Sequence, residues 1–247
     1  MPTVNDLLLQ YDKLMRDIDG KVERVHASAP DIPCGNKCYD CCEQLFPITF
    51  IEAWALSNGI ETLPRALRRE RKRAAEEQRA KILERSPEAL QKTSVERTAA
   101  LRTHAEFARL LHGITASCPA LDPNRAEGSC TVYEFRNHDC RTMGASFDMG
   151  QREVVGCFRF NNLKHIIPNL MSFNYRYDEK QELDQALIAA ATDNAFPPII
   201  YLGTMCTPFL TEFKTTDWTT FFQEKGVPRK NTLSEEESQN YWVVIDA

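Results

Sequence analysis

The chain has 247 residues and a formal net charge of −5 at pH 7, with 43 % hydrophobic and 26 % charged residues. This composition is typical of a globular protein with its own core, and it argues against a disordered or fibrous chain. No apolar run approaches the roughly 20 residues needed to span a bilayer, and acidic residues interrupt the apolar positions of the N-terminus. We therefore expect neither a membrane span nor a signal peptide, and a cytoplasmic location with no membrane partner.

Helical patterns dominate the first part of the chain. Residues 4–27 repeat apolar positions at the spacing of one helical face, which predicts an amphipathic helix. Two prolines in residues 27–33 should end it. Thr49 and Glu52 match a capping box ahead of an apolar run, so a second helix should begin at Thr49 and end near Gly59.

Residues 64–113 are rich in Ala, Arg, Glu, Leu and Gln, with one strong break at 86–87. This predicts two long helices that form an inserted hairpin. The first of them, within 64–85, carries nine basic and four acidic residues, a local charge of +5. Such a cluster can bind nucleic-acid phosphates, but glutamates at i,i+3 and i,i+4 spacing favour a solvated helix face. We therefore do not expect a nucleic-acid partner.

The remaining segments alternate short apolar stretches with turns. Residues 118–140 predict a small β-hairpin that runs into a short helix. Further helices are expected at 178–191 and 209–225, and the apolar segment 241–246 either docks on the body or contacts a partner. The sequence thus predicts a mainly α, irregular helical domain with little strand beyond the hairpin.

Nine cysteines are the chemically informative feature of the chain. Four fall within nine residues as C-x3-C-x2-C-C, and four more follow later: Cys34, Cys38, Cys41, Cys42, Cys118, Cys130, Cys140 and Cys157. In a reducing compartment, grouped cysteines more often bind metal or perform redox chemistry than form structural disulfides. Thiolates are soft ligands suited to zinc and iron–sulfur clusters, so these eight are candidate metal ligands. Cys206 stands alone and is expected in the core.

The number of cysteines leaves several arrangements open. Two tetrahedral sites, one site with spare thiols, or one four-iron cluster with redox-active thiols all agree with it. Adjacent side chains tend to diverge, so Cys41 and Cys42 could serve different centres. His138 is a borderline further ligand, but a surface or hydrogen-bonded histidine is the commoner case and is favoured. Arg136 and Arg141 would stabilise thiolates, hold an anionic substrate, or pair with the carboxylates beside them.

The segments CGNKCYDCC, T-x-x-E and CPALD…GSCTVYEFRNHDCR together resemble the YkgJ-like cysteine-cluster family of zinc- or iron-chelating proteins, of the CxxCxxCC type. The resemblance covers roughly residues 34–60 and 118–160. Two positions depart from the family's pattern, because the first spacing is x3 instead of x2 and Asn137 stands where the family has proline. By this resemblance the carried-over ligands are Cys34, Cys38, Cys41, Cys42, Cys118, Cys130 and Cys140, to which Cys157 is added.

The sequence and the resemblance together predict one cysteine-cluster metal-binding domain over residues 1–247. Its metal core should cover about 28–62 and 114–175, with the two cysteine groups brought together in space. A helical insertion at about 63–113 separates the two halves of that core. A C-terminal helical extension should follow at about 176–247.

The function we expect is a cysteine-ligated zinc- or iron-binding protein, with zinc, iron or a [4Fe–4S] cluster as the cofactor. Binding should release protons and weaken at low pH. Whether the chain is an enzyme is left open. The cysteine motif is shared with flagellin lysine methylases, which implies an iron–sulfur, S-adenosylmethionine-dependent protein-lysine methylase as an alternative. A second alternative is an adaptor in which zinc staples the fold and the helices contact a protein partner.

Overall fold

The structure is a computed structural model that describes residues 2–28, 38–85, 107, 111, 114, 116–122, 129–149, 154–155, 171–172 and 175–246. The helices are α1 (Val4–Ser28), α2 (Phe50–Glu61), α3 (Arg65–Arg85), α5 (His138–Thr142), α6 (Tyr177–Ala191), α7 (Thr207–Leu210) and α8 (Trp218–Glu224). The described residues also form the 3-10 turns η1 (Asp40–Glu43), η3 (Tyr133–Phe135), η5 (Lys230–Thr232) and η6 (Glu237–Gln239). The fold is mainly α, as predicted.

Within the described residues, seven short strands form three small sheets. They are β1 (Leu121–Asp122), β2 (Ser129–Cys130), β3 (Ser146–Met149), β4 (Val154–Val155), β5 (Met171–Ser172), β6 (Ile199–Gly203) and β7 (Trp242–Asp246). The antiparallel pair β1–β2 confirms the hairpin predicted beside the second cysteine group. The other sheets are β4-β3-β5 and the parallel pair β6-β7. Among the described helices, none combines the length and apolar character needed to cross a membrane.

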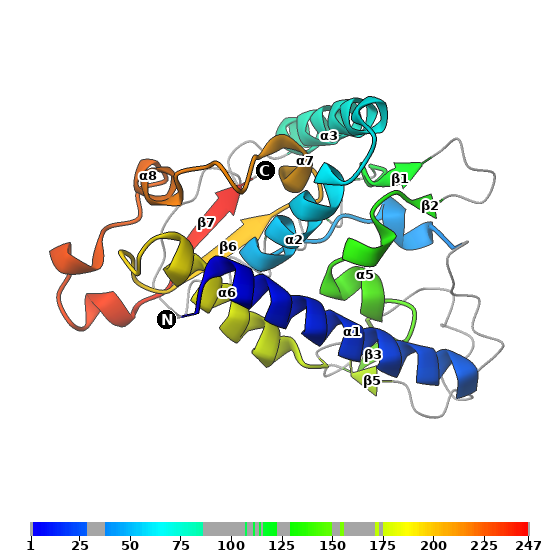
Figure 1. Cartoon of the computed structure of the whole chain (residues 1–247), viewed down its shortest axis with the longest axis horizontal. Coiled ribbons are helices and arrows are strands. Elements are labelled where there is room, and N and C mark those ends of the chain that lie inside the picture. Colours follow the sequence, from blue (N-terminus) through cyan, green and yellow to red (C-terminus); the bar gives the residue numbers. More distant parts are fainter. Residues whose placement is uncertain are drawn as a thin grey trace.

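Helix α1 packs along α6 and crosses α2 and α5 (Figure 1). Its buried residues recur every three or four positions, which places them on one face, as predicted for an amphipathic helix. They are Leu7, Tyr11, Leu14, Met15, Ile18 and Val25. Helix α1 thereby packs against α5, which carries Cys140 of the second cysteine group.

Helix α2 is the most buried helix, and it begins with the predicted capping box. The Glu52 carboxylate accepts hydrogen bonds from the backbone N–H and the hydroxyl of Thr49, at 2.8 and 3.0 Å. The helix ends at Glu61, two residues after the predicted Gly59. Its first residue, Phe50, lies edge-on to Trp218 with ring centroids 4.6 Å apart, so α2 also joins the aromatic core around α8.

Strands β6 and β7 correct the prediction of a purely helical C-terminal extension. They lie side by side in Figure 1, parallel and with Ile199 opposite Trp242. An isolated bridge from Ile48 to Gly203 ties the entry of α2 to the same sheet. The three central residues of β7 are at most 2 % exposed. A run buried on both faces has no alternation to reveal it as a strand, which is why the pattern missed it.

The single helix predicted at 209–225 is also corrected. The structure has two short helices, α7 and α8, separated by a polar stretch. Asp217 caps the second one, because its carboxylate accepts hydrogen bonds from the backbone N–H groups of Thr219 and Thr220 at 3.0 and 3.1 Å. An N-cap marks the first turn of a new helix, so α8 is not a continuation of α7.

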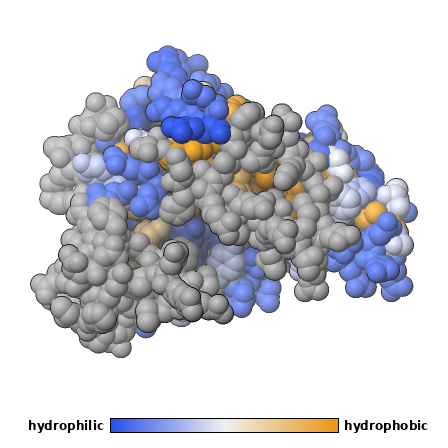
Figure 2. Space-filling view, turned by 180° about the vertical axis from the view of Figure 1, so that it is seen from behind, coloured by the Kyte–Doolittle hydropathy of each residue, from blue (hydrophilic) through white to orange (hydrophobic). Residues whose placement is uncertain are grey.

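Helix α3 is the first half of the predicted helical hairpin, and most of the second half, 87–113, lies outside the described residues. Figure 2 views the molecule from behind, and the upper part of that view, where α3 lies, is strongly hydrophilic. The side chains of Arg71, Ala75, Gln78 and Ile82 are the buried positions of this helix. The remaining face of α3 is solvated, as the interspersed charges predict.

Candidate metal centre

Six of the eight predicted ligands line one cavity of about 280 Å³. They are Cys38, Cys41, Cys42, Cys118, Cys130 and Cys140, and all six are free thiols. Cys34 and Cys157 lie outside the described residues. The fold therefore brings members of both cysteine groups together, which confirms the predicted juxtaposition.

The first cysteine group reaches the cavity through the tight turn η1. The backbone N–H of Cys42 donates to the carbonyl of Tyr39 at 2.8 Å, and that of Gln44 donates to the carbonyl of Cys41 at 3.2 Å. This curvature lets two adjacent cysteines line the same cavity, although neighbouring side chains usually diverge. Whether Cys41 and Cys42 would serve one centre or two stays a prediction.

The second cysteine group is joined to the first by its backbone. The N–H of Cys118 donates to the carbonyl of Cys42 at 2.6 Å. Cys130 lies opposite Leu121 in the β1–β2 hairpin, which holds it beside Cys118. Cys140 sits on α5, where its N–H donates to the capping side chain of Asn137 at 2.9 Å.

The thiols perturb one another's ionisation. A hydrogen bond from the Cys42 thiol lowers the pKa of Cys41 to about 7, whereas the same hydrogen bond and burial raise the pKa of Cys42. Burial raises the pKa of Cys118 to about 12, and nearby thiols add to the effect. Burial also raises the pKa values of Cys130 and Cys140. Burial in this cavity thus opposes the build-up of negative charge on its thiols.

Two arginines form the cationic part of the cavity wall, which also carries acidic residues. Arg141 is ion-paired with Asp19 of α1, and its Nε donates to the carbonyl of Arg136 at 2.8 Å. Arg136 lies over the ring of Tyr133, 3.5 Å from its centroid, and 3.9 Å from Asp19. The sequence suggested neighbouring carboxylates as partners, but α1 supplies the partner instead. Both guanidinium groups lower the pKa of Cys130 against the larger effect of burial.

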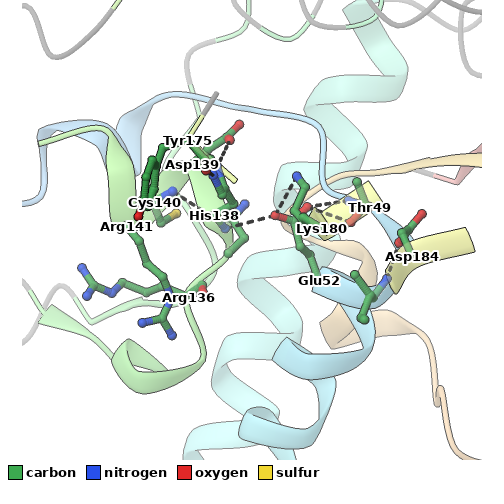
Figure 3. A network of polar contacts seen from close by, with 12 residues as sticks. Thr49, Glu52, Arg136, His138, Asp139, Cys140, Arg141, Tyr175, Lys180 and Asp184 are labelled. Carbon is green, nitrogen blue, oxygen red and sulfur yellow. Dashed lines mark hydrogen bonds and ion pairs between the residues drawn. The ribbon is translucent and has the colours of Figure 1, made fainter. Parts of the chain in front are cut away.

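A buried network behind α5 supports Cys140 (Figure 3). Glu52, 2 % exposed, accepts hydrogen bonds from the backbone N–H of His138 at 3.0 Å and from Nζ of Lys180 at 3.2 Å. Burial opposes the ionisation of Glu52, but Lys180 and the backbone donors together lower its pKa. The T-x-x-E motif therefore links the start of α2 to a backbone position two residues before Cys140.

His138 does not line the cysteine cavity and is hydrogen-bonded instead, which is the interpretation that the sequence favours over a ligand role. Its side chain is fully buried, with Nε2 at 2.8 Å from the carbonyl oxygen of Tyr175 and Nδ1 at 3.3 Å from a carboxylate oxygen of Asp139. Because both ring nitrogens are hydrogen-bonded, neither is free to bind a metal ion. It serves as a bridge between α5 and the segment that precedes α6.

The sequence offered no signal for several other residues of the cavity wall. His26 of α1 lines it, with Nε2 at 3.1 Å from the carbonyl oxygen of Gly144, and Tyr39 and Met205 line it as well. Nothing in the periodicity of α1 distinguishes His26, because its place depends on how α1 crosses α5. Cys206, in contrast, is fully buried away from the wall beside Thr204, as predicted for a core residue.

The donor set fits zinc or iron. Thiol sulfurs from three separate segments face one cavity, and soft thiolates are the ligands that these metals take in structural centres and clusters. Within the described part of the chain, no three Cys, His, Asp or Glu side chains already surround a single point as ligands do. Comparison of the chain with protein-family models, with curated proteins and with solved structures found no match.

Proposed function

We propose that this chain binds zinc or iron through the cysteines of the cavity, with the iron either as an ion or as a [4Fe–4S] cluster. One observation carries the proposal: six thiols line a single cavity, with Cys38 before η1, Cys41 and Cys42 in η1, Cys118 before β1, Cys130 in β2 and Cys140 in α5. Raised pKa values show that the cavity opposes several thiolates without a compensating charge. A soft cation would supply that charge, and the resemblance to the YkgJ-like family supports the same conclusion.

Bound metal would act here as a crosslink between segments far apart in the chain. Cys41 and Cys42 would hold it from η1, Cys118 from the residues before β1, Cys130 from β2, and Cys140 from α5. One tetrahedral centre uses four ligands, so six thiols exceed the need of a single zinc ion. A reducing cytoplasm, the location that the sequence predicts, would keep these thiols available.

Metal and acid-labile sulfide analysis of protein purified without oxygen tests the proposal directly. We expect stoichiometric zinc without colour, or stoichiometric iron with sulfide and broad visible absorption. The second result would lead to tests of S-adenosylmethionine binding. Protein without stoichiometric metal, which also takes up neither zinc nor iron with sulfide, would contradict the proposal.

Single Cys→Ser variants assign the ligands. Cys41→Ser and Cys140→Ser should each reduce metal content sharply, because each removes a thiol from the cavity wall. Cys206→Ser is the matched control, since that thiol is buried elsewhere against Thr204. Equal metal content in all three variants, measured on folded protein, would disprove the assignment.

Proton release checks that the ligands are thiols. Zinc added to metal-free protein in weak buffer should acidify the solution, because protonated cysteines must lose their protons to bind. Retention of metal should correspondingly fall as the pH is lowered. Binding of zinc with no change in pH would argue for ligands other than these cysteines.

A further inference from the structure

A second cavity, of about 880 Å³, lies where the end of α2, the start of α3 and residues 208–215 meet. Helices α3 and α7 pack side by side at this point (Figure 1). Two acidic and five basic residues line the cavity, which gives its wall a formal net charge of +3; the basic ones are Arg65, Arg68, Arg69, Lys72 and Lys214. We call it the basic cavity. None of the described cysteines belongs to its lining, so its ligand is separate from the metal.

Four of these basic residues form a stripe along the start of α3, namely Arg65, Arg68, Arg69 and Lys72. They follow one another at i, i+3, i+4 and i+7 spacing, which places them on one face of the helix. All four are exposed. At a rise of about 1.5 Å per residue, the stripe extends about 10 Å along the helix. The next positions on this face are the buried Ala75 and then Glu76, so the stripe ends after about two turns.

The charges of this stripe are not compensated within the described part of the chain. There, none of the four side chains has an ion-pair or hydrogen-bond partner, whereas the fifth cation, Lys214, is ion-paired with Glu61. Glu212 is the other carboxylate of the lining, and it accepts a hydrogen bond from the hydroxyl of Thr215 at 3.2 Å. One remaining carboxylate cannot neutralise four cations, so the wall keeps an excess of positive charge.

This placement of cations opposes the stability of α3. The positive end of the helix dipole lies at the N-terminus, where cations are unfavourable, and the first turn of α3 contains no acidic residue. Like charges at i,i+3 and i,i+4 spacing also repel one another. Positions that break such local rules without a compensating contact are expected at functional sites. The compensating group has to be an anion.

Part of the cavity wall is apolar, which strengthens the field of these charges. Ile60 of α2 and Phe209 of α7 line the cavity and are only 8 % and 7 % exposed. Pro208 and Leu210 belong to the same lining. A cleft that combines charges of one sign with walls of low dielectric concentrates the electric field on a ligand.

We propose that the basic cavity binds a small linear anion with two or more linked phosphate groups. Arginine suits such a ligand, because its planar guanidinium donates two parallel hydrogen bonds to phosphate oxygens. One phosphate is shorter than the stripe of about 10 Å, so linked phosphates are needed to reach the cations at both ends. The short stripe favours a small molecule over a nucleic-acid strand, and the volume lies within the roughly 300–1,000 Å³ of small-molecule sites.

Isothermal titration calorimetry on the full chain tests the proposal with inorganic tripolyphosphate and orthophosphate. The ionic strength is kept constant, because salt screens exposed charges. Wild type should bind tripolyphosphate at least about tenfold more tightly than orthophosphate, since each further hydrogen bond to a charged group contributes about that factor. Absence of binding, or equal binding of the two anions, would overturn the proposal. Metal content measured before and after each titration identifies any heat that comes from metal removed by phosphate.

A double variant with Arg68→Gln and Arg69→Gln places the ligand in the basic cavity. Its affinity for tripolyphosphate should fall at least about tenfold, because two cations of the stripe are removed. Arg85→Gln, exposed at the other end of the same helix, is the matched control and should bind as wild type does. Unchanged affinity of the double variant would overturn the proposal.

Two further probes identify the source of the phosphates. ATP without magnesium carries three linked phosphates on a nucleoside, so tighter binding of ATP than of tripolyphosphate would assign a nucleoside polyphosphate. Equal or weaker binding of ATP would assign a free oligophosphate. A short single-stranded oligonucleotide that binds more tightly than both would indicate a nucleic-acid surface and overturn the proposal.

Thermal unfolding without ligand separates a binding role of the arginines from a folding role. The double variant should keep the Tm of wild type or exceed it, because repulsion at the start of α3 is removed. A lower Tm would mean that these arginines serve the fold, which overturns the proposal.

Discussion

Asp184 of α6 carries a buried carboxyl group that contacts the start of α2. Its Oδ1 accepts a hydrogen bond from the backbone N–H of Ile51 at 2.7 Å, and the residue is 4 % exposed. Burial raises its pKa to about 7, well above the 3.8 of a free aspartate. A raised pKa in the folded state means that folding favours the protonated form. The resulting stabilisation is complete at acidic pH and is lost as the pH rises towards 7.

Asp184→Asn should remove this pH dependence. Between about pH 4 and 7, the free energy of unfolding of wild type should fall relative to the variant by up to about 1.4 kcal/mol per pH unit. Urea denaturation across this range measures the difference. Asp178→Asn, an exposed position on the same helix α6, is the control and should follow wild type. A parallel pH profile for Asp184→Asn would contradict the assignment.

Glu52→Gln tests the buried ion pair with Lys180. Removal of one charge leaves Lys180 buried without its partner, so the free energy of unfolding should fall by about 3–5 kcal/mol. Glu61→Gln, the same substitution on the same helix, breaks only an exposed pair with Lys214 and should cost less than about 1 kcal/mol. Denaturant unfolding of both variants measures these changes. Similar losses of unfolding free energy in the two variants would contradict the structural role of Glu52.

At the scale of elements, the close contact between α2 and η3 positions the second cysteine group. A Cβ placed on Gly59 would lie 2.5 Å from ring atoms of Phe135. Only glycine allows η3 to approach α2 so closely, and η3 leads directly into α5 with Cys140. The packing of η3 against α2 thus helps to determine the position of the Cys140 thiol.

Gly59→Ala and Gly20→Ala should change stability in opposite directions. The first creates an overlap in the core and should lower the free energy of unfolding by about 1–3 kcal/mol. The second lies within α1, where the nearest atom to the new Cβ is the flexible end of Arg24 at 3.7 Å. There alanine should add up to about 1 kcal/mol. Thermal unfolding of both variants checks the signs, and equal signs would refute the packing argument.

At the scale of the whole molecule, strand β7 closes the core by pairing with β6. Ile245, 2 % exposed, lies in this strand. Ile245→Ala should lower the free energy of unfolding by about 2–5 kcal/mol, because it leaves a cavity in the core. Leu83→Ala removes the same number of carbon atoms, but from a position that is 40 % exposed, and should change stability by about 0.5 kcal/mol or less. Equal losses would show that β7 is not part of the core.

Local patterns were sufficient for part of the fold. The apolar spacing of α1, the Thr49–Glu52 capping box and the pairing of β1 with β2 depend on residues that are close together in the sequence, and the structure contains all three. The same kind of information failed for β7 and for the break between α7 and α8. A doubly buried strand lacks alternation, and a mid-segment cap competes with helix propensity.

For the candidate site, the sequence by itself determined which residue types are present and how the cysteines are grouped. Only the tertiary structure decided that Cys41, Cys118 and Cys140 share one cavity, that Asp19 pairs with Arg141, and that His138 faces away from the thiols. The physical reason is the distance along the chain over which each kind of interaction acts. Periodicity and capping act over one or two helical turns, whereas these neighbours are set by how α1, α2 and α5 pack, which no local pattern encodes.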